Sequence, residues 1–141
     1  MVRLGYSESV KEAFSCWLSE KHGYFQPPRR LDALETIAFI KAIGAVAVLA
    51  HPFLNLEEAG LREFLPQAVA AGLDGMECYY PKFDAEQTAL AERLCDTHGL
   101  LRSGGSDFHG QNKPDIQLGT GRGDLRVSCG LLEKLRQRAA L

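Results

Sequence analysis

The stretch AVAVLAHP (residues 45–52) decides the fold class of this chain. Its apolar run contains two valines and lies between a glycine and a proline, which predicts a strand buried on both faces of a sheet. Apolar residues recur at helical spacing on both sides of it and predict helices at about 31–43 and 56–71, with Pro66 as a kink or boundary in the second. A strand between two helices indicates a β/α protein.

Two further stretches continue this alternation. GLDGMECYYP (72–81) and GLLRSGGSDFHG (99–110) each predict a short strand, and helices are expected at about 7–22, 84–98 and 128–139. Helices that alternate with strands predict a parallel sheet or part of a (β/α) barrel. Because an open sheet of three parallel strands has two unprotected edges, we expect the chain to be incomplete or to pair with another chain.

Composition limits the possible environment and partners. The 141 residues suit one domain, and a net charge of −2 gives no general attraction to nucleic acid or anionic membranes. The longest apolar run is interrupted by Lys41 and a glycine, and the N-terminal stretch lacks a signal sequence, so a cytoplasmic protein without a membrane span is expected. None of the four cysteines forms a C-x-x-C pair, which favours reduced and mostly buried thiols.

The four histidines divide by context. His22 and His98 each precede a glycine at the end of a predicted helix, where a histidine has a structural explanation. His51 instead follows a predicted strand, and Asp107 and His109 follow another. The carboxyl ends of parallel strands are where α/β proteins place their chemistry. These three side chains are therefore candidates for a functional site.

Two imidazoles and a carboxylate are a suitable ligand set for zinc, iron or manganese. If the third strand stays extended, Asp107 and His109 share one face, and Phe108 points the other way into the packing. The alternative is a hydrogen-bonded core histidine at His51 and a turn residue at Asp107. For one residue alone the two interpretations are evenly balanced, whereas the coincidence of all three favours a metal site.

Other side chains could support such a site. A glutamate within a short buried strand is costly unless it is paired, so Glu77 either orients a ligand histidine or lies at a solvent-exposed edge. Arg102, Lys113 and Arg122 lie in or near loops at the same predicted edge and are candidates for phosphate binding. Each of them alone is also compatible with an ordinary solvated surface charge.

Taken together, these motifs resemble a known family. A-H-P after a strand, G-M-E-C-Y-Y, and G-G-S-D-F-H-G followed by K-P and L-G resemble the C-terminal half of PHP-domain (polymerase and histidinol phosphatase) metal-dependent phosphoesterases. The branch of this family that the chain resembles acts on nucleoside 3′,5′-bisphosphates and short oligoribonucleotides. The stretch S-V-K-E-A-F is similar to part of the helical insertion of that branch. The resemblance implies part of that insertion in residues 1–43 and the C-terminal part of a distorted (β/α)7 barrel in residues 44–141.

The resemblance also implies roles for individual residues. His51 matches a single metal-binding histidine of the family, and Asp107 and His109 match its final Asp-x-His pair, as metal ligands and catalytic residues. Family members hold two or three divalent ions, for which Mn, Zn, Fe and Mg are candidates. The opening H-x-H-T-x-x-S-D-G motif of the family is absent from this sequence, so a truncated domain with part of the ligand set is expected.

The implied function is hydrolysis of phosphate esters of nucleotides or short oligonucleotides by a metal-activated water, with this chain alone weakly active or inactive. A separate N-terminal half or a second copy of the chain in a homodimer would complete the active site. The alternative is a non-catalytic remnant or oligomerising module, and a third possibility is a related hydrolase such as a histidinol-phosphate phosphatase. The sequence leaves open the metal, the substrate, and whether Met1 is the native start.

Overall fold

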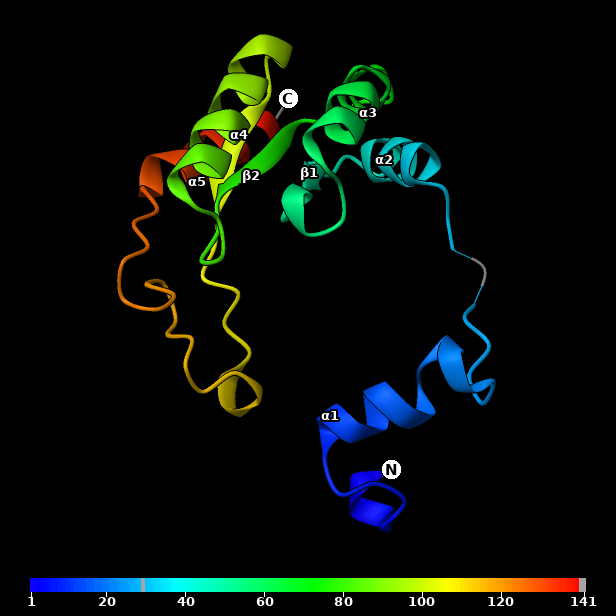
Figure 1. Ribbon diagram of the computed structural model, residues 1–141. Helices are drawn as coiled ribbons and strands as arrows, with labels where there is room; N and C mark the ends of the chain where they lie inside the picture. Colours follow the sequence, from blue (N-terminus) through cyan, green and yellow to red (C-terminus); the bar gives the residue numbers. More distant parts are fainter. Residues whose placement is uncertain (29, 140–141) are drawn as a thin grey trace. The chain divides into compact units, whose positions relative to one another are not determined.

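The computed structural model describes residues 1–28 and 30–139, and the chain divides into two compact units, residues 1–31 and 32–141 (Figure 1). The boundary at residue 43 between a helical insertion and a barrel part remains a prediction. The first unit is built from short helical segments: the 3-10 turn η1 (Val2–Leu4), α1 (Val10–Glu12), the π-helical η2 (Ala13–Trp17) and the 3-10 turn η3 (Glu20–His22).

The prediction of one helix over residues 7–22 is therefore wrong, and serine side chains explain why. The Ser9 hydroxyl accepts a hydrogen bond from the Glu12 amide at 3.0 Å, so the helix begins only after Ser9. Ser19 accepts one from the Lys21 amide at 3.3 Å and starts a separate turn. Serine competes for nearby backbone groups and so favours helix starts over helix interiors.

The second unit contains the sheet. Its strands β1 (Val48–Leu49), β2 (Gly75–Tyr79) and β3 (Leu101–Gly104) are parallel and lie in the order β1-β2-β3. The helices are α2 (Ala33–Ala42), α3 (Glu58–Ala70), α4 (Ala85–His98) and α5 (Cys129–Ala139), and the 3-10 turns are η4 (Pro52–Leu54) and η5 (Gly110–Asn112). This arrangement confirms the predicted α/β fold with three parallel strands and flanking helices.

The helices of this unit form close to where the sequence predicted them, and α2 and α4 begin with side-chain caps that explain their starts. The Asp32 carboxylate accepts two amide hydrogen bonds at the start of α2, and Asp84 and Gln87 form a capping box at the start of α4. His98 ends α4 and is followed by Gly99 at φ 66°, as expected for a helix-terminal histidine before glycine. Helix α3 continues through Pro66.

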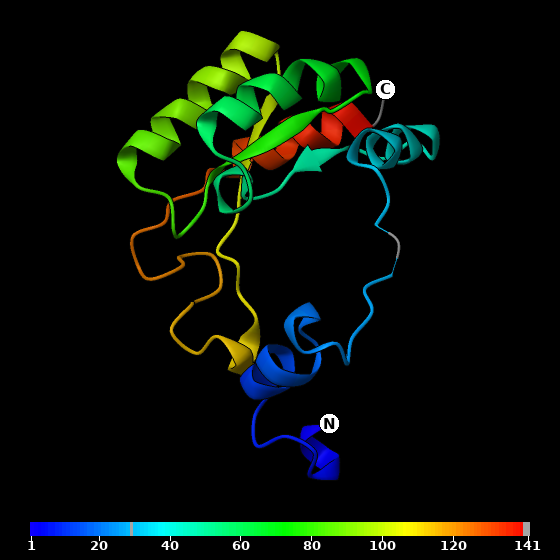
Figure 2. The ribbon, with the colours of Figure 1, turned by 45° about the vertical axis from the view of Figure 1, so that its right-hand side comes forward.

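Strand β2 lies at the centre of the core. Helices α3 and α4 lie side by side along the sheet (Figure 2). Met76 and Cys78 of β2 are fully buried in one core cluster with residues of both helices. The residues of β1 and β3 are only half-buried, so the expectation that the first strand is buried on both faces is wrong. Each of these strands pairs with β2 on one side only, which explains the difference.

A buried carboxylate holds the other end of the sheet. Asp74 is 4% exposed and accepts hydrogen bonds from the Lys41 ammonium at 2.8 Å and the Ala47 amide at 2.9 Å. The guanidinium of Arg138 on α5 lies 3.5 Å from the same carboxylate. Asp74 thus ties α2 and α5 to the start of β2. Within residues 1–28 and 30–139, no helix combines the length and apolar character needed to cross a membrane.

Candidate metal and phosphate site

His51 lies just after β1 in a backbone conformation that is uncommon for residues other than glycine. Its φ is 33°, in the left-handed region, and its amide donates a 2.7 Å hydrogen bond to Oε2 of Glu77. Its ring nitrogen Nδ1 is buried and has no hydrogen-bond partner among the described residues. A buried nitrogen without a partner is costly. The conformation and the lone nitrogen together make His51 a candidate ligand.

Glu77 is half-buried on β2 beside His51. Burial raises the pKa of its carboxyl group, the hydrogen bond from the His51 amide lowers it in part, and the negative charge of Asp107 raises it further. The sequence left open whether Glu77 orients a ligand histidine or lies at a solvent-exposed edge. The structure places the two residues together, with the contact made to the backbone of His51 and not to its ring.

Asp107 and His109 also lie close together, although not as predicted. Strand β3 ends at Gly104, and Asp107 has a φ of 56°, so the segment turns and the alternation of strand faces does not apply. Nδ1 of His109 lies 2.7 Å from the Asp107 carbonyl and 3.5 Å from its Oδ1. Phe108, expected within the packing, is 47% exposed as a consequence of this turn.

The Asp107 carboxylate is the most strongly engaged group of the site. Its Oδ2 accepts hydrogen bonds from the Lys113 ammonium at 2.6 Å and from the Tyr80 hydroxyl at 2.9 Å. The ammonium beside it is the main reason why the pKa of Asp107 is lowered. Asp107 is therefore held as an anion at neutral pH, as a metal or cation ligand requires.

Tyr80 connects the two parts of the site, although no motif in the sequence marks it as a functional residue. Its ring lies 5.7 Å from the His51 ring between centroids, and its hydroxyl donates to Asp107. Burial and this hydrogen bond raise the pKa of Tyr80 to about 12. Its position at the end of β2, beside Glu77, was the sequence signal that could have identified it.

Gly104, the first of the two glycines before Asp107, serves strand packing. A Cβ atom at Gly104 would lie 2.6 Å from the Cβ of Tyr79 and 2.7 Å from its carbonyl oxygen. The lack of a side chain at Gly104 lets β3 approach β2, since the two nearest atoms that a side chain would meet there belong to Tyr79 of the neighbouring strand.

The donor set fits a divalent ion in part. Imidazole and carboxylate are the ligand types of Zn, Fe and Mn sites, and the unpartnered Nδ1 of His51 is available for coordination. Among residues 1–28 and 30–139, however, no three His, Cys, Asp or Glu side chains lie close enough together to form a metal-binding group. His51 on one side and the Asp107–His109 pair on the other are joined by Tyr80.

A small basic pocket adjoins Asp107. Its volume is about 190 Å³, and it is lined by Lys82, Lys113 and Arg122 together with Tyr80, Pro81, Asp107, Asp115 and Ile116. Arg122 also pairs with Asp115 at 3.2 Å. Arg102 does not line this pocket: its guanidinium binds Glu92 and Asp96 of α4, each at 2.8 Å. Of the three predicted phosphate ligands, two therefore lie beside Asp107.

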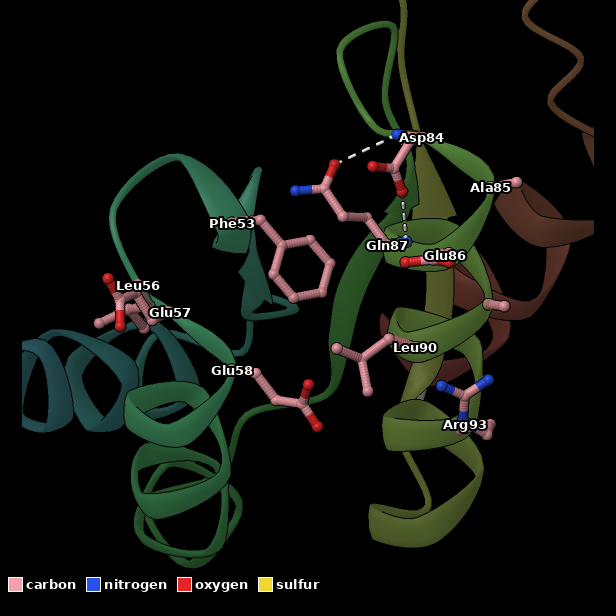
Figure 3. A pocket seen from close by; sticks show the side chains of 11 residues that line it. Phe53, Leu56, Glu57, Glu58, Asp84, Ala85, Glu86, Gln87, Leu90 and Arg93 are labelled. Carbon is pink, nitrogen blue, oxygen red and sulfur yellow. Dashed lines mark hydrogen bonds between the residues drawn. The ribbon is translucent and has the colours of Figure 1, made fainter.

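A larger groove lies between the N-terminal ends of α3 and α4 (Figure 3). It has a volume of about 800 Å³ and combines apolar side chains with an acidic rim, formed by Glu57, Glu58, Asp84 and Glu86. Among the described residues that line it, Arg93 is the one basic residue. Carboxylates repel phosphate, so this groove is a poorer phosphate site than the basic pocket.

Comparisons with known proteins agree with the resemblance found in the sequence. The chain is 30% identical over 120 residues to the 5'-3' exoribonuclease Rnm of Escherichia coli, a match that covers 84% of this chain and 41% of the relative. It is 32% identical over 81 residues to the phosphoribosyl 1,2-cyclic phosphate 1,2-diphosphodiesterase of Eggerthella lenta, over 57% of this chain and 29% of the relative. No family model matches the chain.

The fold has solved counterparts. A crystal structure from Bifidobacterium adolescentis, described as a metal-dependent phosphoesterase, superimposes with a TM-score of 0.72 at 31% identity, over 97% of this chain and 47% of the other. An amidohydrolase structure from Chromobacterium violaceum gives a TM-score of 0.68 at 21% identity, over 97% and 48%, and supports the fold alone.

Fold and relatives thus point to one class, the metal-dependent phosphoesterases. Within that class they confirm the resemblance to PHP-domain proteins that the A-H-P and G-S-D-F-H motifs indicated. The chain spans less than half the length of these relatives.

Proposed function

We propose that this chain supplies part of the active site of a PHP-type phosphoesterase that hydrolyses phosphate esters of nucleotides or short oligonucleotides. The observation that carries the proposal is the buried, unpartnered Nδ1 of His51, linked through Tyr80 to the Asp107–His109 pair at the carboxyl ends of parallel strands. Relatives named as an exoribonuclease and as a phosphoribosyl cyclic phosphate diesterase support this class of substrate.

In this proposal His51, Asp107 and His109 hold the metal, and Asp107 and His109 are also the catalytic residues. The chemistry that a divalent ion (Mn, Zn, Fe or Mg) supplies when bound is a water of lowered pKa and neutralisation of phosphate charge. Glu77 fixes the position of His51 through its amide, and the Tyr80 hydroxyl orients the Asp107 carboxylate. These contacts would keep the ligand atoms in place before substrate binds.

Lys113 and Arg122 are proposed to bind the phosphate of the substrate in the basic pocket, with Lys82 beside them. Lys113 already lies 2.6 Å from Asp107, so a phosphate bound by its ammonium would sit next to the proposed metal ligands. Arg102 was a third candidate, but its pairing with two carboxylates of α4 favours a structural role.

The test is hydrolysis of a nucleoside 3′,5′-bisphosphate and of a short oligoribonucleotide in the presence of Mn²⁺, by this chain alone and mixed with the N-terminal half of a PHP relative. We expect activity in the mixture that His109→Ala abolishes and His22→Ala leaves intact. No activity in the mixture, or equal activity of both variants, would contradict the proposal.

A second candidate function is an oligomerising module without catalysis. The half-buried strands β1 and β3 favour it, because strands of a parallel sheet are normally covered on both faces. This proposal requires a stable homodimer in sizing chromatography at micromolar concentration and no turnover with the added half.

A further inference from the structure

Two cysteines meet in the core next to the candidate site. Cys78 on β2 and Cys95 on α4 are both fully buried, and their sulfur atoms lie 3.4 Å apart as free thiols. The other two cysteines, Cys16 and Cys129, are exposed, so the expectation of mostly buried thiols holds for only half of them. No role in the proposed hydrolysis involves the buried pair.

We propose that Cys78 and Cys95 form a reversible disulfide when the protein meets a hydroperoxide. The two sulfur atoms need to approach from 3.4 Å to a bond length of ~2.05 Å, a shift that side-chain rotation and a small strand adjustment can provide. A second thiol already in place favours disulfide formation over further oxidation of the first.

The chemistry balances with hydrogen peroxide as the oxidant. The thiolate of one cysteine attacks one peroxide oxygen, the O–O bond breaks, and the protein gains a sulfenic acid while one water leaves after protonation. The sulfur of the other cysteine then attacks the sulfenic acid sulfur and displaces the hydroxyl group as a second water. The two thiols lose two protons and two electrons, and the peroxide is reduced to two waters.

The surroundings favour a thiolate in the pair. The charge of Arg102 acts to lower the pKa of both thiols, and the hydrogen bond between the sulfur atoms stabilises a thiolate at the one that accepts it. Because either sulfur can be the donor of that hydrogen bond, either cysteine can react first. Peroxide is small enough to reach the pair during local opening of α4, whose outer surface is solvent-exposed.

The proposed disulfide would join β2 covalently to α4. Cys78 lies between Glu77, which holds the His51 amide, and Tyr79, whose hydroxyl donates to Glu92 of α4 at 2.6 Å. Oxidation would fix this part of β2 to the helix. The modification itself does not depend on the proposed hydrolase function.

The experiment uses the full chain carrying Cys16→Ser and Cys129→Ser, so that only the buried pair remains. After hydrogen peroxide treatment of the folded protein we expect both thiols to disappear, the intact mass to fall by two hydrogens, and a linked peptide that contains Cys78 and Cys95. Dithiothreitol should restore both thiols. Adding Cys95→Ser, or Cys95→Ala if the serine variant unfolds, should abolish the linked peptide.

Two results would overturn the inference. One is full retention of both thiols at a peroxide exposure that oxidises Cys16 and Cys129 in the unmodified chain. The other is a disulfide that forms in urea but not in the folded protein, which would show that the native arrangement does not favour it.

Discussion

Replacing Gly104 by alanine tests how the end of β3 is held against β2, and with it the position of the loop that carries Asp107. A Cβ atom at this position would lie 2.6 Å from the Tyr79 Cβ, 2.7 Å from the Tyr79 carbonyl oxygen and 3.1 Å from Cγ2 of Val127. Backbone atoms cannot move aside as the end of a flexible side chain can, so the two strands must separate locally.

The expected cost is about 3 kcal/mol of unfolding free energy, at the upper end of ordinary overpacking, because two of the three close atoms belong to the main chain or Cβ of β2. With a urea dependence of about 2 kcal/mol per molar, the unfolding midpoint should fall by about 1.5 M. Gly105 is the matched control, since the nearest atom to its added Cβ is Oε1 of Glu77 at 3.6 Å, an ordinary contact.

The assay is urea unfolding followed by far-ultraviolet circular dichroism on Gly104→Ala, Gly105→Ala and the unchanged chain. The free energy of unfolding of Gly105→Ala should stay within about 1 kcal/mol of that of the unchanged chain. Alanine also lowers the conformational entropy of the unfolded chain, which stabilises the folded state. Equal midpoints for the two variants would refute the close approach of β3 to β2 at Gly104.

Three further predictions concern the buried carboxylate Asp74, the phenol of Tyr80 and the basic pocket. Asp74→Asn should cost about 2 kcal/mol in urea unfolding, because it removes the charge that pairs with the partly exposed Lys41 and Arg138 and weakens the buried hydrogen bond from the Ala47 amide, and a loss below about 1 kcal/mol would contradict this. In the metal-free chain, a difference titration against Tyr80→Phe should place the ionisation of this phenol near pH 12. Because its folded pKa is raised, the associated stability is complete below the ordinary tyrosine pKa and is lost as pH rises toward 12, and Asp107→Asn should lower the value. Arg122→Met should weaken binding of inorganic phosphate about tenfold in calorimetry, whereas Arg102→Met should leave it unchanged, and the reverse order would reassign the phosphate site.

Much of the sheet and its helices could be predicted from local signals. The apolar run before His51, the glycine at Gly99 and the capping residue Asp84 each mark an element boundary by chemistry that acts over a few residues. The second-unit elements therefore lie close to their predicted ranges. The elements of the first unit do not match the predicted single helix. Apolar residues recur at helical spacing there, but Ser9 and Ser19 cap separate helical segments and so divide it.

The candidate site was predictable in its location but not in its geometry. The prediction that Asp107 and His109 share one face assumed that the strand continues past Gly104, where it in fact ends. The left-handed backbone conformation of Asp107 could not be inferred from the presence of an aspartate alone. Tyr80 was missed because a tyrosine at a strand end has an ordinary packing explanation. Its hydrogen-bond partner Asp107 is 27 residues away along the chain, so local sequence patterns could not reveal the contact.

We propose above that His51, Asp107 and His109 bind a divalent metal, and the metal content after equilibrium dialysis against Mn²⁺ is the decisive test. We predict that the chain retains Mn²⁺, that His51→Ala and Asp107→Ala each lower the affinity at least about tenfold, and that the helix-end control His98→Ala does not. Failure of the unchanged chain to retain the metal, or equal retention by all three variants, would contradict the account.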